Sequence, residues 1–172
     1  MRFLLRLSLL GILLVLTAAC IRPAAQGKWA WGRQLALGVG PLRLVEQVGY
    51  QEGNTSYVLR PQSPDRVLAA TLVTVVNQRS ARLLLLVDEK AAFLEDAQGN
   101  QYGPLNPFTR RREVSASGGG SGTFQPLLWG TVEVPQGYQV AGWLFFEVPL
   151  GVQVNRLRWE QGDTVLVPFR GR

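Results

Sequence analysis

The fold is decided by residues 67–76, which read VLAATLVTVV and are followed directly by Asn77. This stretch holds only Val, Leu, Ala and Thr, so a strand built from it would present apolar side chains on both faces. Because side chains alternate between the two faces of a strand, a strand of this kind is normally covered on both. The stretch therefore predicts a central strand of a β-sheet.

Shorter runs with an alternating apolar pattern lie on both sides of this strand, separated by turn residues. In residues 154–159, Leu157 and Trp159 share one face. Arg156 and Arg158 share the other, as in a strand with one wet face. No run shows a convincing helical stripe, so the sequence predicts an all-β antiparallel sandwich in a single domain. The expected strands are residues 34–39, 42–48, 67–76, 82–87, 92–95, 101–102, 127–134, 140–148, 154–159 and 164–169.

The sequence also predicts the conformation of three segments that lie between or beside these strands. Gly40-Pro41 separates the first two strands, which we expect to pair with each other. Residues 49–64 are rich in Gly, Asn, Ser, Gln and Pro and are expected to form a loop. Residues 88–96 could form one helical turn at most.

The N-terminus has the pattern of an export signal. Residues 1–6 contain Arg2 and Arg6, and residues 7–21 are rich in Leu and contain no charged side chain. This uncharged run is shorter than the roughly 20 apolar residues that a spanning helix needs. We therefore expect a signal peptide over residues 1–19.

The end of that run, Leu16-Thr17-Ala18-Ala19-Cys20, resembles the lipobox of bacterial lipoproteins. Small residues precede an obligatory Cys there, although Thr17 stands where Leu is commonest. The resemblance implies cleavage before Cys20, a diacylglyceryl group on its thiol, and a lipid anchor at the extracytoplasmic face of the cell membrane. Two alternatives stay open: an ordinary signal peptide that leaves Cys20 as a free thiol, and an uncleaved anchor.

Residues 20–33 are expected to form a lipid-anchored tether that leads to the domain at residues 34–172. Ile21, not Asp, follows the Cys, which favours the outer membrane if the host has two membranes. Trp29 and Trp31 stand at the end of the tether. They could be a membrane-interface pair or a ligand-stacking pair, but we favour a ring that covers the end of the sandwich.

The composition argues against an enzyme. The chain has no His and one Cys, which excludes Ser-His-Asp and Cys-His arrangements, and its two lysines lie in no recognisable motif. The adjacent carboxylates Asp88-Glu89 and Glu95-Asp96 would point to opposite faces of a strand. We therefore expect no catalytic residue, no cofactor and no metal site. Asp96, Gln98 and Asn100 faintly resemble a cation loop, but the later bidentate Glu is missing, which favours a plain hairpin turn.

The net charge of +6 falls to about +4 once the two signal-peptide arginines are removed. Part of this positive charge lies in three consecutive arginines, Arg110, Arg111 and Arg112. They come shortly before residues 115–122, which are nearly all Ser and Gly. We expect a surface loop whose arginines could grip lipid phosphate, an anionic wall polymer or an acidic patch of a partner protein. The alternative that we favour is a solvated loop with incidental charge. Nucleic acid is disfavoured, because no aromatic residues interleave with the basic ones.

Three tryptophans fall within expected strands, and we favour packing roles for Trp129, Trp143 and Trp159 over a sugar-binding platform. Trp143 is out of phase with Leu144 and shares a face with Phe145. If that face is exposed to solvent, Trp143 is the best candidate for a binding patch.

The order of several segments resembles a known family. The long strand ends in Asn77, residues 93–102 read FLEDAQGNQY, and residues 135–149 join a PQG turn to the strand VAGWLFFEVP. This order is similar to the telokin-like immunoglobulin-fold domain of unknown function found in bacterial lipoproteins and secreted proteins. The resemblance covers residues 34–169 and implies an immunoglobulin-like β-sandwich outside the cytoplasm. It implies no catalytic residues.

Together these observations predict a non-enzymatic, envelope-anchored lipoprotein that acts as a binding or structural module. The expected partners are the membrane, through Cys20, and an envelope protein or an anionic wall polymer. The alternatives are a carbohydrate- or lipid-binding module that uses exposed Trp residues, and an accessory lipoprotein of a transport or assembly complex.

Overall fold

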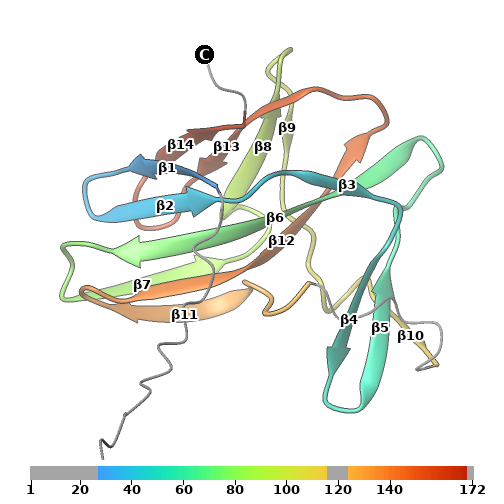
Figure 1. The fold of residues 1–172 in the computed structure, drawn as a ribbon, viewed down its shortest axis with the longest axis horizontal. Coiled ribbons are helices and arrows are strands. Elements are labelled where there is room, and N and C mark those ends of the chain that lie inside the picture. Colours follow the sequence, from blue (N-terminus) through green and yellow to red (C-terminus); the bar gives the residue numbers. More distant parts are fainter. Residues whose placement is uncertain (1–26, 116–123, 170–172) are drawn as a thin grey trace, which may run out of the picture.

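The computed structural model describes residues 27–115 and 124–169 (Figure 1). Within these ranges no residue is helical, so no helix there could cross a membrane. The expected signal peptide and Cys20 lie outside the described residues. The strands are β1 (Lys28–Trp31), β2 (Leu35–Val39), β3 (Arg43–Val45), β4 (Val48–Glu52), β5 (Thr55–Leu59), β6 (Arg66–Asn77), β7 (Arg82–Val87), β8 (Ala92–Asp96), β9 (Gln101–Tyr102), β10 (Arg112–Val114), β11 (Gly130–Pro135), β12 (Gln139–Pro149), β13 (Val154–Trp159) and β14 (Val165–Pro168).

Strand β6 is central, as its sequence predicts. It pairs antiparallel with β12 along one edge and with β2 and β3 along the other, and β1 extends the sheet beyond β2. The expected pairing of residues 34–39 with 42–48 is wrong. Gly40-Pro41 makes no reversal, because Gly40 keeps its place beside β6 by donating its N–H to the carbonyl of Leu72 (2.8 Å). Strands β2 and β3 therefore follow each other along the same edge of β6.

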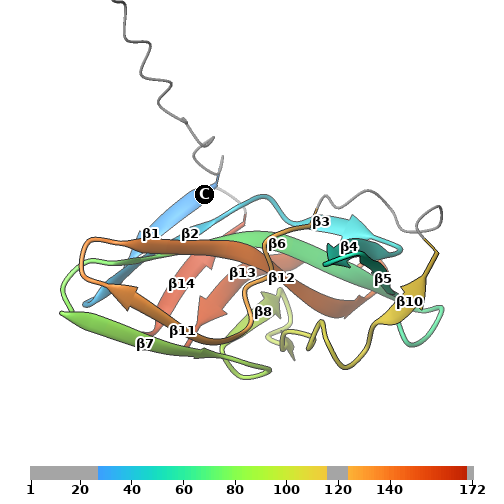
Figure 2. The ribbon, with the colours of Figure 1, turned by 90° about the horizontal axis from the view of Figure 1, so that it is seen from below.

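The main core lies between this sheet and a second layer, which consists of the pair β11-β7 and the four-stranded sheet β14-β13-β8-β9 (Figure 2). The apolar residues alternate as the period-two pattern predicts. For example, Val73 and Val75 of β6 point into this core, as do Leu144 and Phe146 of β12. The all-β antiparallel sandwich is therefore confirmed.

The other face of β6 and β12 is also covered over half its length. Strands β10, β5 and β4 form a small sheet at one end of the molecule (Figures 1 and 2). Val48 and Tyr50 of that sheet pack with Phe145 in a second core cluster. The expectation of a loop over residues 49–64 is therefore wrong for residues 49–59, which mostly form the hairpin β4–β5.

Gly142 shows how closely the chain passes over the free edge of β12. A Cβ atom at this position would lie 2.7 Å from the backbone N of Leu128, too close for any side chain. The backbone of Leu128 donates its N–H to the carbonyl of Trp143 (3.1 Å), and Trp143 donates to Pro126 (2.8 Å). An irregular segment therefore seals an edge that would otherwise expose unpaired backbone groups.

Four residues of the range expected for the tether, residues 20–33, belong to the sheet. Lys28–Trp31 form the edge strand β1, which pairs with β2 in the register Trp29↔Gly38 and Trp31↔Ala36. The sequence analysis missed this strand because it has four residues and directly follows a stretch of small residues.

Candidate functional site

The three arginines that the sequence singles out do not lie together. Arg112 begins β10 and pairs with Val58 of β5. Because side chains alternate along this extended segment, Arg110 and Arg112 line one hollow while Arg111 points to the other side. The three arginines therefore do not share one environment, because the segment divides them between two sides.

Arg111 has a structural role. Its guanidinium lies 3.9 Å from the ring centroid of Tyr57 and pairs with the carboxylate of Glu52. Phe108 also lies within reach of it, at 5.4 Å. Arg111 thus ties the segment before β10 to the hairpin β4–β5, and its charge is compensated.

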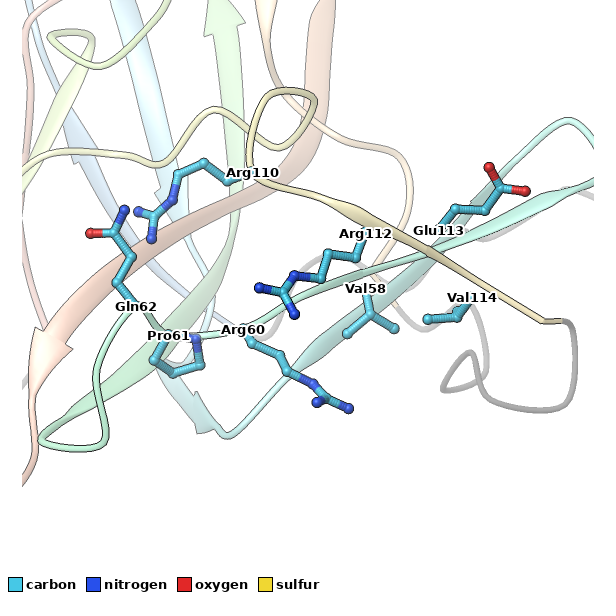
Figure 3. A pocket seen from close by; sticks show the side chains of 8 residues that line it. All are labelled: Val58, Arg60, Pro61, Gln62, Arg110, Arg112, Glu113 and Val114. Carbon is cyan, nitrogen blue, oxygen red and sulfur yellow. The ribbon is translucent and has the colours of Figure 1, made fainter.

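Arg110 and Arg112 line a pocket of about 510 Å³ (Figure 3). Arg60, which comes one residue after β5, adds a third guanidinium. Figure 3 shows these three side chains around the hollow, with Val58 between Arg60 and Arg112. Val114 adds a further apolar side chain. Gln62 and the carboxylate of Glu113 also line it, so the pocket combines an apolar floor with three arginines, one amide and one carboxylate.

Among the described residues, only one of these three arginines forms an ion pair. Arg110 forms an ion pair with Glu147 of β12, with 3.0 Å between Nη2 and Oε2. Neither Arg60 nor Arg112 has an ion pair with any other described residue. Arg60 and Arg112 are both exposed. The site therefore presents two guanidinium groups without an ion pair among the described residues, and a guanidinium binds phosphate and carboxylate groups through paired hydrogen bonds.

The loop that carries Arg60 is held by defined contacts. The backbone N–H of Gln62 donates to Oε1 of Glu147 (2.7 Å), so one carboxylate fixes both this loop and Arg110. Ser63 donates its hydroxyl to Asp65, and this hydrogen bond holds the pKa of Asp65 below its usual range. Hydrogen bonds therefore hold the loop that carries Arg60 in place.

A second, more open hollow of about 430 Å³ adjoins the pocket. It shares Arg60, Pro61 and Gln62 with the first and adds Arg66 and Glu46. Arg60 therefore stands between two hollows, and a ligand with more than one negative charge could extend from one into the other. We call the first hollow, with Arg60, Arg110 and Arg112, the arginine pocket.

Trp143, the other expected binding residue, is not available to a ligand. It is 9% exposed, packs edge-on against Phe124 with 4.9 Å between ring centroids, and lies beneath Arg43. The face that it shares with Phe145 is covered by the small sheet β10-β5-β4, which the sequence analysis did not anticipate. The favoured packing role of Trp143 therefore agrees with the structure, and the condition for a binding patch, a face exposed to solvent, is not met.

Asp96 closes the hairpin β8–β9, as the favoured interpretation of that segment predicts. Its carboxylate accepts hydrogen bonds from the backbone N–H groups of Gln98 and Asn100 (both 2.9 Å). It also accepts from the side chains of Asn100 (2.8 Å) and Tyr102 (2.9 Å). These bonds, the Asn100 side chain first, hold the pKa of Asp96 below its usual range.

This hairpin gives a pH-dependent prediction. A carboxyl whose pKa is lower in the folded than in the unfolded state stabilises the fold above its unfolded pKa, and this contribution is lost as the pH falls through the folded pKa. Asp96→Asn should therefore be less stable than the wild type at pH 7, and the difference should shrink below about pH 4. Urea midpoints measured from pH 7 to pH 2.5 test this. A difference that stays constant over that range would contradict the assignment.

Comparisons with known proteins agree with the fold and give no function. No family model matches the chain, and no curated protein matches it. Among solved structures, ycdA from Bacillus subtilis, described as a candidate lipoprotein, matches with a TM-score of 0.51 and 14% identity. That match covers 85% of this chain and 40% of ycdA.

Two further structures match with lower scores. The secreted protein MPT63 of Mycobacterium tuberculosis has a TM-score of 0.42 and 17% identity, over 78% of this chain and 82% of that one. An uncharacterised β-sandwich protein from Clostridium difficile has a TM-score of 0.47 and 8% identity, over 84% and 91% of the two chains. At these identities the likeness concerns the fold alone, which is an all-β sandwich.

Proposed function

We propose that this protein is a non-enzymatic binding module of the bacterial envelope, anchored through an acylated Cys20, and that its arginine pocket binds an anionic group of an envelope polymer. The observation that carries the proposal is the pair Arg60 and Arg112, which lack ion pairs among the described residues and flank an apolar floor. A guanidinium recognises phosphate and carboxylate through paired hydrogen bonds, so the ligand class is an anion.

The absence of reactive groups in the sequence supports a binding role over catalysis. The chain has no His, and the neighbouring carboxylates Glu95 and Asp96 serve different structural partners. Glu95 pairs with Arg156, and Asp96 closes its own hairpin. Neither carboxylate is left available as a general acid or base.

We also propose that the domain belongs to the telokin-like immunoglobulin-fold family. The three motif segments occupy defined positions in the sandwich: Asn77 ends β6, residues 93–102 contain the hairpin β8–β9, and residues 140–149 lie within β12 beside β6. Membership of that family and the lipobox-like segment at Cys20 both support an extracytoplasmic location.

Titration of the full-length protein, purified from host membranes in detergent, tests the pocket. An intact mass that matches residues 20–172 plus acyl chains would first establish the anchor. Two probes distinguish the anion: poly(glycerol phosphate) carries phosphodiesters and polyglutamate carries carboxylates. We expect Arg60→Gln/Arg112→Gln to weaken binding of the preferred polymer about tenfold or more, because it removes two charge-assisted contacts.

The control is Arg79→Gln/Arg82→Gln, which changes the net charge equally. Arg79 is exposed far from the pocket along the chain, and Arg82 pairs with Glu133. This variant should keep its affinity. Equal weakening in both variants would mean that only net charge matters, and binding of neither polymer would contradict the proposed ligand class.

A further inference from the structure

We propose that the outer face of β1, with Trp29 and Trp31, lies on the lipid bilayer that holds the protein. This inference rests on the proposed anchor at Cys20 and assigns a second contact surface, separate from the arginine pocket. It fixes which side of the sandwich faces the membrane.

The two tryptophans point outward because of strand alternation. Ala30 packs against the main core, so its neighbours Trp29 and Trp31 face away from it. Trp29 is 37% exposed and Trp31 is 69% exposed. An edge strand that leaves two indole rings this exposed, two residues apart on one face, presents a large apolar surface to its surroundings.

Packing within the domain accounts for only one of the two rings. Trp29 lies over Gly38 of β2, where a Cβ atom would come within 2.7 Å of the indole ring. The side chain of Trp31 has no hydrogen bond and no ring contact with another described residue. The expectation that one ring covers the sandwich therefore applies to Trp29, and Trp31 is left without a structural role.

The strands beside these rings carry small side chains, and since Ala36, Gly38 and Thr74 are buried, the exposed apolar surface here is that of the two indole rings. Across the sheet from Trp31 and Trp29 come Ala36 and Gly38 of β2, and then Val76 and Thr74 of β6. These side chains are small. The sheet β10-β5-β4 covers only the other half of this face, at the far end of the molecule (Figure 2).

The position of the anchor selects the bilayer as the occupant. Lys28 follows Cys20 by eight residues, a length that spans at most about 29 Å when fully extended. A domain of this size has a radius of gyration of about 15 Å. The anchor therefore keeps β1 within about one domain width of the membrane, whatever path the tether takes.

The charges near β1 favour an anionic lipid surface. Lys28 of β1 and Arg33 of the turn after it are basic, and residues 20–45 contain no acidic side chain. The carboxylate of Asp163 also lies here, at the turn after β1, and accepts hydrogen bonds from the backbone N–H groups of Arg33 and Gln34. Tryptophan concentrates at membrane interfaces, and basic residues near the surface strengthen attachment to anionic lipids.

Quenching by brominated lipid tests the contact. The full-length acylated protein is reconstituted into vesicles of phosphatidylglycerol and phosphatidylcholine, with and without bromine on the acyl chains. We expect brominated lipid to quench part of the tryptophan fluorescence, and Trp31→Phe to remove most of that quenched part. The control is Trp129→Phe, which changes a half-buried ring just before β11 in the other layer and should keep the quenching.

The outcomes separate this inference from the anchor. If the protein floats with the vesicles and Trp31→Phe is quenched as strongly as the wild type, the anchor stands and the contact surface is wrong. If the wild-type protein floats with the vesicles but is not quenched, the proposed bilayer contact is also wrong. This outcome includes the case in which a second copy of the chain covers Trp31. A protein that does not float with the vesicles overturns both proposals.

Discussion

Trp159→Ala should lower the free energy of unfolding by about 3–5 kcal/mol. Trp159 is 0% exposed and is the largest side chain buried in the main core, on strand β13 between β8 and β14. Its removal would leave a cavity between the two layers. It would also leave the carbonyl of Gln161 without the indole N–H that it accepts at 2.7 Å. Urea unfolding followed by circular dichroism measures this loss.

The matched control for this substitution is Trp31→Ala, which removes the same ring from an exposed position. Its free energy of unfolding should change by no more than about 0.5 kcal/mol. Comparable losses in the two variants would mean that the main core does not lie where the structure places it.

Asn77→Ala should lower the free energy of unfolding by about 2–4 kcal/mol, because it leaves one buried and two partly buried backbone groups without their partner. Asn77 is 0% exposed at the end of β6. Its side chain donates to the carbonyls of Ser80 (2.7 Å) and Val134 (2.8 Å) and accepts the N–H of Ser80 (3.0 Å). One amide thereby ties the turn after β6 to the end of β11.

Ser80→Ala provides the comparison for Asn77. It removes only a hydroxyl that bonds Gln34 at the surface, so the free energy of unfolding should change by less than about 1 kcal/mol. Urea unfolding of the two variants under the same conditions measures the difference in their free energies of unfolding. An Asn77→Ala protein as stable as Ser80→Ala would show that these hydrogen bonds are replaced by water at little cost.

Strong local patterns allowed most of the fold to be predicted. Residues 82–87, 101–102 and 154–159 are strands with the expected bounds, and β6 extends one residue beyond each end of its predicted range. In each case the period-two pattern is continuous and turn residues mark the ends. The pairing of the strands was harder to predict, because the period-two pattern indicates which face of a strand is buried but not which strand lies next to it.

The cover over Trp143 was not anticipated because the sequence analysis missed one hairpin. Residues 49–64 look like a loop by composition, yet Gly53-Asn54 is a two-residue turn signal between alternating runs. Gly53 takes a φ of 59°, which such a turn requires. Recognition of this signal would have predicted strands β4 and β5, and with them a cover for the face that carries Trp143.

The arginine pocket could be predicted only in part. Alternation alone separates Arg111 from Arg110 and Arg112, provided that the segment is extended. Arg60 could not have been added, because it lies about fifty residues earlier in the chain and joins the others only through the pairing of β5 with β10. Sites assembled by long-range strand pairing leave no local signal in the sequence.

The central claim is that the arginine pocket binds an anionic polymer, and the side-chain Nε–Hε signals of its arginines test it most directly. In a titration of the full-length protein with poly(glycerol phosphate) or polyglutamate, we expect the signals of Arg60 and Arg112 to shift together and to saturate. The signals of Arg79 and Arg82 should stay in place. Uniform shifts at all four arginines, or none at Arg60 and Arg112, would contradict the account.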